Sequence, residues 1–323
     1  ELLKARFPDV PILLGGVYAT LCTGHARKLD NIDHVIAGYG EEEAIRWLDA
    51  HFGITAPVDT GDSQGDPDIP WDLYPDLSSL IVLTARGCPY DCSFCATSRL
   101  NEKFLQRNPH SVAREILHHT KSRNVRDVVF YDDALFIKKR QHLEVILDEI
   151  MESTDQLRYH TPNGLFAGMI DAQLAQKMVD ANFKTLRLSF ETSNEGRRKD
   201  MNNKVTNRDF LQAMDHLDNA GFPRSKVEVY TLMGLPGQSY DEIIKSIEFV
   251  NNAGAKVSLT SFTPIPGTLD YNRAVESGGI QPGTDPLLLN NTIYPLKNSE
   301  LTYDNFNELK SYAKKLNQNL SEI

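Results

Sequence analysis

A regular alternation of apolar and amphipathic segments between residues 79 and 268 constrains the fold of this chain more than any other feature. Strand-like runs alternate with helical segments, a pattern that favours parallel strands joined by helices. The predicted strands are 79–85, 125–133, 157–165, 185–190, 226–234 and a sixth strand that, with its exit, covers 256–268. The predicted helices are 110–123, 138–153, 171–182, 206–220, 240–253 and, at the C-terminus, 302–320. Six such units predict an α/β fold built as a partial (β/α)6 TIM barrel, short of the eight units of a complete barrel.

A smaller α/β segment precedes this array. Residues 11–14 form an apolar run that ends at Gly15 and Gly16, and residues 32–37 form a second run that leads into an amphipathic helix. Residues 1–55 are therefore interpreted as the C-terminal part of a Rossmann-like parallel α/β domain. Because the sequence opens on a helix with no strand before it, we expect an N-terminal portion to precede it.

Composition changes between these two parts. Residues 56–76 are rich in Pro, Gly and Asp and poor in aliphatic side chains, which is typical of a linker. We expect a linker at 56–76, a partial-barrel domain at 77–275 and a C-terminal extension at 276–323 that closes the barrel.

Charge and hydropathy exclude several classes of function. The chain has 34 Lys and Arg against 44 Asp and Glu, a net charge of −10, which argues against general nucleic-acid binding through a basic surface. No run approaches the roughly 20 apolar residues of a membrane span, and no signal peptide opens the chain. We therefore expect a protein without a membrane span.

Three of the four cysteines lie close together, directly after the first predicted strand of the barrel. Cys88, Cys92 and Cys95 have the spacing C-x3-C-x2-C. Three thiolates on one loop can hold three corners of a cubane iron–sulfur cluster, whereas ferredoxin-type clusters use four, so one iron would be open to an outside molecule. Zinc is the alternative, with Cys22 or a histidine as fourth ligand, but the paired C-x2-C knuckles typical of zinc sites are absent.

This loop resembles that of the radical S-adenosylmethionine superfamily. The resemblance rests on the cysteine spacing, on Phe94 before the last cysteine and on the position after the first of six strands, and it covers residues 79–270. It implies a 4Fe-4S cluster on the three cysteines, whose open iron binds S-adenosylmethionine. It also implies an external one-electron reductant, such as flavodoxin or ferredoxin, and reductive cleavage of S-adenosylmethionine to a 5′-deoxyadenosyl radical that attacks a substrate. Because such a cluster is oxygen-sensitive, the resemblance further implies a cytoplasmic location, where thiols stay reduced.

The resemblance further implies S-adenosylmethionine contacts at the ends of the first and second strands. The backbone around Phe94 would contact the adenine. Where many members carry a Gly-Gly-Glu-like stretch for the methionine ammonium, this chain has Tyr131, Asp132 and Asp133. Either carboxylate could accept from the ammonium; a helix N-cap is the alternative for Asp133.

Later strands supply further candidates for S-adenosylmethionine binding. Ser189 and Glu191 end the fourth strand, where related enzymes contact the ribose or the methionine carboxylate. Arg187 shares their side of the strand, so it either meets that carboxylate or forms a structural ion pair. Gly234 and Pro236 belong to a Gly-Leu-Pro-Gly-Gln turn frequent in the coproporphyrinogen oxidase-like and cobalamin-associated branches, where glycine permits close approach to a ligand.

The catalytic residue and the substrate, a small molecule or a peptide, are not identified by the sequence. His160, beside the Thr-Pro-Asn-Gly stretch at the end of the third predicted strand, is a candidate proton donor or substrate contact. A lone histidine on a strand is more often structural.

The N-terminal segment is similar to the last third of the cobalamin-binding domains that precede radical S-adenosylmethionine domains in one branch. In that branch a glycine pair lies near the nucleotide tail of cobalamin, which makes Gly15 and Gly16 candidate cobalamin contacts. A turn in a Rossmann-like fold is the alternative.

The leading interpretation is a radical S-adenosylmethionine enzyme of the cobalamin-domain-associated branch, with cobalamin-dependent methyl transfer as one candidate reaction. The alternative among enzymes is an oxidoreductase or rearrangement enzyme whose N-terminal domain binds no cobalamin. The alternative of another class is a non-enzymatic iron–sulfur or zinc-binding module, which would need a fourth ligand near the loop.

Overall fold

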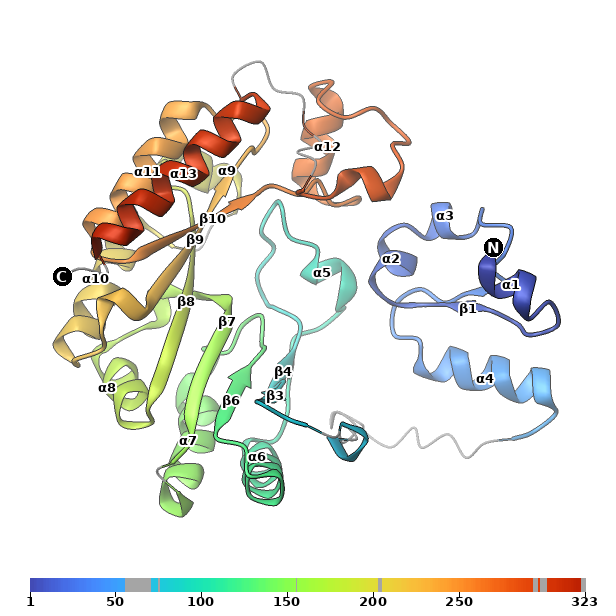
Figure 1. The fold of residues 1–323 in the computed structure, drawn as a ribbon, viewed down its shortest axis with the longest axis horizontal. Coiled ribbons are helices and arrows are strands. Elements are labelled where there is room, and N and C mark those ends of the chain that lie inside the picture. Colours follow the sequence, from blue (N-terminus) through green and yellow to red (C-terminus); the bar gives the residue numbers. More distant parts are fainter. Residues whose placement is uncertain are drawn as a thin grey trace.

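The computed structural model describes residues 1–55, 71–74, 76–154, 156–202, 205–292, 296 and 301–320. Its core is a sheet of six parallel strands in the order β10-β9-β8-β7-β6-β3 (Figure 1). The strands are β3 (Leu80–Val82), β6 (Asp127–Phe130), β7 (Arg158–Phe166), β8 (Phe183–Glu191), β9 (Val227–Met233) and β10 (Lys256–Ser261). Each strand pairs with its neighbour in the sequence order, so the predicted six-stranded α/β architecture of a partial barrel is confirmed.

Helices connect successive strands and cover the convex face of the sheet (Figure 1). These are α6 (Pro109–Arg123), α7 (Leu143–Ser153), α8 (Ala172–Asp180), α10 (Asn207–Asn219) and α11 (Tyr240–Asn252). Side chains cap the starts of several of these helices: the Asn108 side chain accepts from two backbone N–H groups of α6, and Thr206 forms a capping box with Asp209 at α10.

The alternation of side chains along a strand separates those packed in the hydrophobic core under the helices from those on the inside of the partial barrel. On β9, Val227, Val229 and Met233 are buried against the helices, whereas Glu228 and Tyr230 face the opposite, concave side. The inside of the partial barrel thus receives Glu228 and Tyr230 from this strand.

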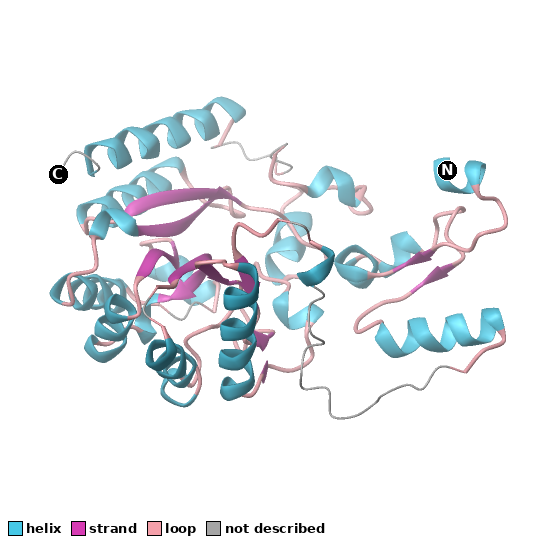
Figure 2. Cartoon of the chain, turned by 60° about the horizontal axis from the view of Figure 1, so that its bottom comes forward, coloured by secondary structure: helices cyan, strands magenta, loops and turns pink. Residues whose placement is uncertain are grey.

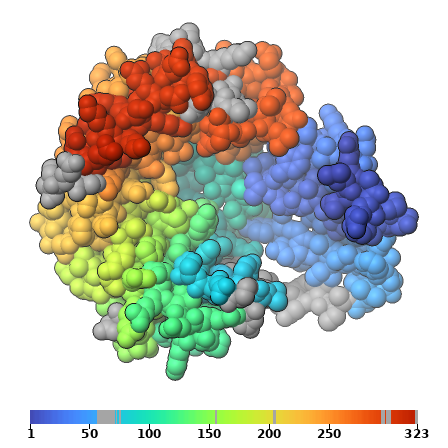
Figure 3. Space-filling model, in the orientation of Figure 1, coloured from blue at the N-terminus to red at the C-terminus, as the bar shows by residue number. Residues whose placement is uncertain are grey.

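The N-terminal segment contains a two-stranded parallel sheet that lies apart from the barrel sheet (Figure 2). Its elements are α1 (Leu2–Arg6), β1 (Leu13–Leu14), α2 (Gly16–Leu21), α3 (Thr23–Ala26), β2 (His34–Val35) and α4 (Glu41–Phe52). In the space-filling view this segment lies beside the barrel (Figure 3). Tyr39 Oη donates to Asn101 Oδ1 at 3.0 Å across this contact.

The predicted linker lies largely outside the described residues. At its end, residues 71–73 form the 3₁₀ helix η1 (Trp71–Leu73), and Trp71 is buried in the main core of the barrel. Arg123 of α6 donates to the Trp71 carbonyl at 2.7 Å. The packing of the barrel therefore extends to Trp71, before the boundary at 77 that the composition suggested.

Short elements complete the described structure. They are β4 (Ala85–Arg86), α5 (Thr97–Leu100), β5 (Leu105–Gln106), η2 (Lys139–Gln141), η3 (Ala167–Met169), α9 (Glu195–Asp200), η4 (Arg224–Lys226), α12 (Leu269–Glu276), η5 (Pro286–Leu289) and α13 (Tyr303–Leu320). Among the helices of the described ranges, none has the length and apolar character that a membrane crossing requires.

The C-terminal helix α13 covers the β10 end of the sheet, where it lies beside α11 (Figure 1). The Asn317 side chain accepts from the Val257 backbone N–H at 2.8 Å and donates to the Val257 carbonyl at 2.9 Å. An edge strand exposes such groups for unwanted pairing, so Asn317 protects this edge. The helix therefore covers the side of the barrel, while α12 lies at its carboxyl end.

Candidate active site

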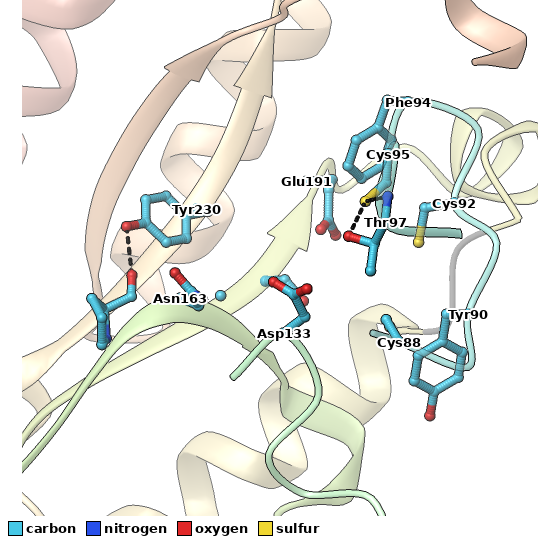
Figure 4. Close-up of a pocket in the computed structure, with 13 residues that line it drawn as sticks. Cys88, Tyr90, Cys92, Phe94, Cys95, Thr97, Asp133, Asn163, Glu191 and Tyr230 are labelled. Carbon is cyan, nitrogen blue, oxygen red and sulfur yellow. Dashed lines mark hydrogen bonds between the residues drawn. The ribbon is translucent and has the colours of Figure 1, made fainter. Parts of the chain in front are cut away.

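A cavity of 310 Å³ lies at the carboxyl ends of the parallel strands (Figure 4). Functional sites of β/α barrels are found at this end. Its lining combines the cysteine loop with residues of β7, β8 and β9 and of the segment that follows β6: Cys88, Tyr90, Cys92, Phe94, Cys95, Thr97, Asp133, Pro162, Asn163, Gly164, Ser189, Glu191 and Tyr230.

The cysteine loop connects β4 to α5, and its base is closed by antiparallel pairing of β4 with β5. Gly87 opens the loop at φ +79°, and a Cβ there would lie 2.9 Å from the Lys103 carbonyl oxygen, so glycine is required. Cys92 is buried, Cys88 and Cys95 are half-buried, and all three line the cavity. The cysteines lie on one side of it and Tyr230 on the other (Figure 4).

The sulfur of Cys95 has two hydrogen-bond partners in Thr97. The Thr97 backbone N–H donates to Cys95 Sγ at 3.5 Å, and the thiol donates to Thr97 Oγ1 at 3.2 Å. With a deprotonated sulfur the hydroxyl group can rotate and donate instead. Hydrogen bonds to cysteine sulfur are one of the means by which a protein sets the potential of an iron–sulfur cluster.

The donor set of the cavity fits an iron–sulfur cluster with three protein ligands. In the described part of the chain, no three His, Cys, Asp or Glu side chains converge tightly enough to hold a single metal ion. A cubane cluster binds each thiolate through a different iron, so its ligands surround a larger body. Cys22, the fourth ligand in the zinc alternative, lies between α2 and α3 in the N-terminal segment.

Asp133 lines the cavity, but Asp132 does not belong to its lining. Asp132 is fully buried, and its carboxylate accepts from Thr84 N at 3.0 Å and from Thr84 Oγ1 at 2.8 Å. Burial raises the pKa of Asp132 to about 7. His142, whose pKa is lowered by burial, lies with Nε2 3.0 Å from Thr84 Oγ1. Asp132 therefore anchors the segment that leads into the cysteine loop.

Ser189 and Glu191 both line the cavity, as Glu191 ends β8. The pairing of β8 with β9 shifts between these two residues. Glu191 has φ +60°, a left-handed conformation that is uncommon outside glycine and is concentrated at functional sites. Behind it lies the buried Arg198, whose guanidinium carbon is 5.5 Å from the centre of the Phe190 ring.

Arg187 and His160 form structural contacts on the inside of the barrel, outside the cavity lining. Arg187 Nε lies 2.9 Å from Glu228 Oε2, which is the ion pair considered as its alternative role. The His160 ring nitrogens lie 3.0 Å from Thr185 Oγ1 and 3.0 Å from Asp127 Oδ1. His160 lies near the start of β7, two residues before the lining residue Pro162, and does not itself line the cavity.

The turn that contains Gly234 and Pro236 is stabilised by contacts within the protein, and neither residue lines the cavity. Gly234 has φ +87°, and a Cβ there would lie 2.7 Å from Cζ of Phe306 in α13. Arg197 Nη1 donates to the Pro236 carbonyl at 3.0 Å. The buried Gln238 closes the turn, since its side chain accepts from Leu235 N at 3.1 Å. Packing thus accounts for the glycine.

Gly15 and Gly16 stand where β1 gives way to α2, in the N-terminal segment. Gly15 is the residue before α2, and Gly16 opens it at φ +85°. This is a strand-to-helix turn of the Rossmann-like type, and it lies outside the cavity that contains the cysteines.

Six lining residues were missed as candidates in the sequence: Tyr90, Thr97, Pro162, Asn163, Gly164 and Tyr230. Three of them form a bulge in β7, where the pairing with β8 shifts between Thr161 and Leu165. Proline and glycine inside a predicted strand are the signal that could have identified this bulge. A Cβ on Gly164 would lie 2.9 Å from Tyr230 Cδ2, and Tyr230 Oη donates to the Pro162 carbonyl at 2.9 Å.

Comparison with known proteins agrees with this geometry. Residues 82–250 match the family model of the Radical SAM superfamily. An uncharacterized methyltransferase of Pyrococcus horikoshii is 23% identical over 207 residues, covering 60% of this chain and 42% of the relative. Biotin synthase of Brucella ovis is 24% identical over 195 residues, covering 59% of this chain and 58% of the relative. The chain thus spans about half the length of these curated relatives.

Solved structures with a similar fold include an enzyme that has been solved with cobalamin bound and a cobalamin-dependent enzyme. The radical S-adenosylmethionine methyltransferase TsrM from Kitasatospora setae, with tryptophan and a SAM analogue bound, gives a TM-score of 0.65 at 15% identity, covering 85% of this chain and 60% of that one. The cobalamin-dependent S-adenosylmethionine radical enzyme OxsB gives 0.63 at 12% identity, covering 85% of this chain and 44% of that one. At these identities the likeness concerns the fold.

Proposed function

Because this chain belongs to the radical SAM superfamily, we propose that it carries a 4Fe-4S cluster on Cys88, Cys92 and Cys95 and uses it to cleave S-adenosylmethionine. The supporting observation is that these thiols share one cavity with the carboxylates Asp133 and Glu191. A cluster held by these cysteines would supply one electron to the sulfonium, and cleavage of a carbon–sulfur bond would then give methionine and a 5′-deoxyadenosyl radical able to abstract hydrogen from a substrate.

The lining residues divide into groups suited to the parts of S-adenosylmethionine. The Asp133 carboxylate accepts from the methionine ammonium in a charge-assisted hydrogen bond. Ser189 and Glu191 accept from the ribose hydroxyl groups. Phe94 lies beside the adenine and is supported from behind by Met201, Leu235 and Phe262.

Water has to be excluded from the reacting centre, and the aromatic side chains that line the cavity exclude it. Tyr90 packs edge-to-face on Phe166, with ring centres 5.3 Å apart, beside the cysteines. Tyr230 stands on the far side of the cavity, where the substrate would meet the radical (Figure 4). An external one-electron donor, a flavodoxin or ferredoxin, completes the system.

Cobalamin-dependent methyl transfer is the second candidate. One relative is named a methyltransferase, and TsrM and OxsB each match 85% of this chain, more than the barrel alone. Gly15 and Gly16 would then lie near the cobalamin tail. Gel filtration after addition of hydroxocobalamin tests this candidate. Visible absorbance of cobalamin that elutes with the protein supports it, and complete loss of that absorbance excludes it and favours hydrogen abstraction without cobalamin.

Product analysis after anaerobic reconstitution tests the proposed activity. With dithionite and S-adenosylmethionine, the protein should release 5′-deoxyadenosine and methionine in equal amounts. Single Cys→Ala substitutions at positions 88, 92 and 95 should abolish release and cluster iron, whereas Cys22→Ala should leave both intact. Release that persists in all three variants would overturn the proposal.

A further inference from the structure

Ser93, one of the two residues between the second and third cysteines, is held by segments that follow two other strands, β8 and β10. Ser93 is 4% exposed, and each of its polar groups has a distant partner. Its N–H donates to the Met201 carbonyl at 3.1 Å, and its carbonyl accepts from Asp270 N at 3.0 Å. Its hydroxyl group donates to Asp270 Oδ2 at 2.6 Å.

Asp270 is itself fixed. It is 3% exposed and lies in the first turn of α12, after the N-cap Thr268. Its second carboxylate oxygen accepts from Arg273 Nη1 at 2.8 Å, and Arg273 also donates to the Asp200 carbonyl at 3.2 Å. A buried carboxylate with two partners and a place in a helix N-terminal turn has little freedom to move.

These contacts connect segments that follow the two edge strands of the six-stranded sheet, β3 and β10. The cysteine loop follows β3, at one end of the sheet, and α12 follows β10, at the other. In Figure 1, α12 lies above the loop that carries α5, at the carboxyl end of the barrel. The loop is also held at Asp91, whose carbonyl accepts from Asn202 Nδ2 at 3.2 Å.

We propose that Asp270 is a positioning residue for the cluster-binding loop, and that it acts through Ser93 to hold Cys92 and Cys95 toward the cavity. The role in cluster binding rests on the proposed function, whereas the hydrogen bonds between Asp270 and Ser93 do not depend on it. Ser93 lies directly beside Cys92 and two residues before Cys95, so a rotation of its peptide would turn both thiols. Asp270 touches neither thiol, so its effect passes through the Ser93 hydrogen bonds.

Thiol labelling in the cluster-free protein tests this without any use of activity. The variants are Asp270→Ala, Ser93→Ala and their combination, with Asp218→Ala as control, because Asp218 makes a comparable 3.0 Å ion pair with Arg224 at an exposed site. Alkylation by iodoacetamide is followed peptide by peptide, with Cys22 as the internal reference. Loss of a buried charge-assisted hydrogen bond should raise the Cys92 rate roughly tenfold or more, and leave Cys22 unchanged.

The double variant distinguishes a shared hydrogen bond from general loosening. If Asp270 acts through Ser93, the combined effect should be no larger than that of Asp270→Ala alone. The conservative Asp270→Asn, which keeps the shape and one acceptor, should recover part of the protection. Should Asp270→Ala prove unstable, the smaller Ser93→Ala change carries the test.

Reconstitution supplies the second readout. The Asp270 and Ser93 variants should lose iron to a chelator faster than wild type, with a broadened signal of the reduced cluster. Unchanged Cys92 labelling and iron loss in folded Asp270→Ala and Ser93→Ala would overturn the inference. A wild-type protein that binds no cluster would instead contradict the proposed function, while the labelling result would still stand.

Discussion

Asp132 and Asp133 are consecutive in the sequence after β6, yet their side chains lie in different environments, one in the protein interior and one in the cavity. Asp133 lines the cavity with the cysteines, whereas the Asp132 carboxylate accepts from Thr84 N at 3.0 Å in the protein interior. One acid is therefore available to a ligand, and the other supports the segment before the cysteine loop. Substitution of each by asparagine should have a separate and distinct effect.

Asp133→Asn should weaken S-adenosylmethionine binding. The charge-assisted hydrogen bond to the ammonium is worth about 1.5–3 kcal/mol, so the dissociation constant should rise roughly tenfold to hundredfold. Anaerobic calorimetry on the reconstituted protein measures it, and Asp132→Asn provides the matched comparison. Equal affinity of wild type and Asp133→Asn would show that Asp133 does not hold the ammonium.

Asp132 should make folding stability depend on pH. Its folded pKa of about 7 lies above the ordinary 3.8, so between these values the folded protein keeps a proton that the unfolded chain releases. The contribution of Asp132 to stability is therefore complete below pH 3.8 and is lost as the pH rises through 7. The amide that replaces it in Asp132→Asn cannot titrate, so the stability difference between wild type and this variant should fall by up to about 1.4 kcal/mol per pH unit in that window. Anaerobic urea unfolding across the window checks this; a flat difference would contradict it.

Thr97 should raise the reduction potential of the cluster. Thr97→Val keeps the shape and the backbone N–H bond to Cys95, but it removes the hydroxyl group that accepts from the Cys95 thiol and can donate to the deprotonated sulfur. Reduction adds negative charge to the sulfurs, so at one solution potential the ratio of reduced to oxidised cluster should fall about twofold to tenfold, as for a hydrogen bond of ~0.5–1.5 kcal/mol. A potentiometric titration measures this, with Thr97→Ser as the control that retains the hydroxyl group. Identical midpoints for Thr97→Val and wild type would remove Thr97 from this role.

Gly234 should matter for packing more than for ligand binding. In Gly234→Ala the new Cβ meets Phe306 at a positive φ, which should cost roughly 1–3 kcal/mol of unfolding free energy. Gly237→Ala shares the positive φ but has no neighbour within 4 Å, so it should lose less. Phe306→Ala should relieve part of the Gly234→Ala penalty in the double variant. A loss of S-adenosylmethionine affinity in stably folded Gly234→Ala would restore the glycine as a ligand contact.

The order of the elements could be predicted from the sequence because each strand and helix has a local pattern of apolar residues. Helix α11, for example, was expected at 240–253 and spans Tyr240–Asn252. The triplet Cys88, Cys92 and Cys95 was equally accessible, since its spacing is a local property. The predicted sixth strand with its exit, 256–268, corresponds to β10, which ends at Ser261, and to the Pro-rich segment that leads to α12.

Contacts between distant segments could not be predicted in this way. Nothing local distinguishes Asp270 from other acids in a first helical turn, yet it bonds Ser93, 177 positions away. The same holds for Gly234, whose glycine requirement comes from Phe306 in α13, and for Tyr230, which reaches the cavity from β9. Alternation showed that Arg187 shares a face with Ser189, but only the fold shows Glu228 as its partner.

Electron paramagnetic resonance tests whether Cys88, Cys92 and Cys95 hold a 4Fe-4S cluster that binds S-adenosylmethionine. Spectra of the anaerobically reconstituted, dithionite-reduced protein are recorded with and without S-adenosylmethionine. We expect a reduced 4Fe-4S signal that changes shape when S-adenosylmethionine is added, because three thiolates would leave one iron of the cluster open. Stoichiometric zinc with no cluster signal, or a cluster signal that S-adenosylmethionine leaves unchanged, would contradict it.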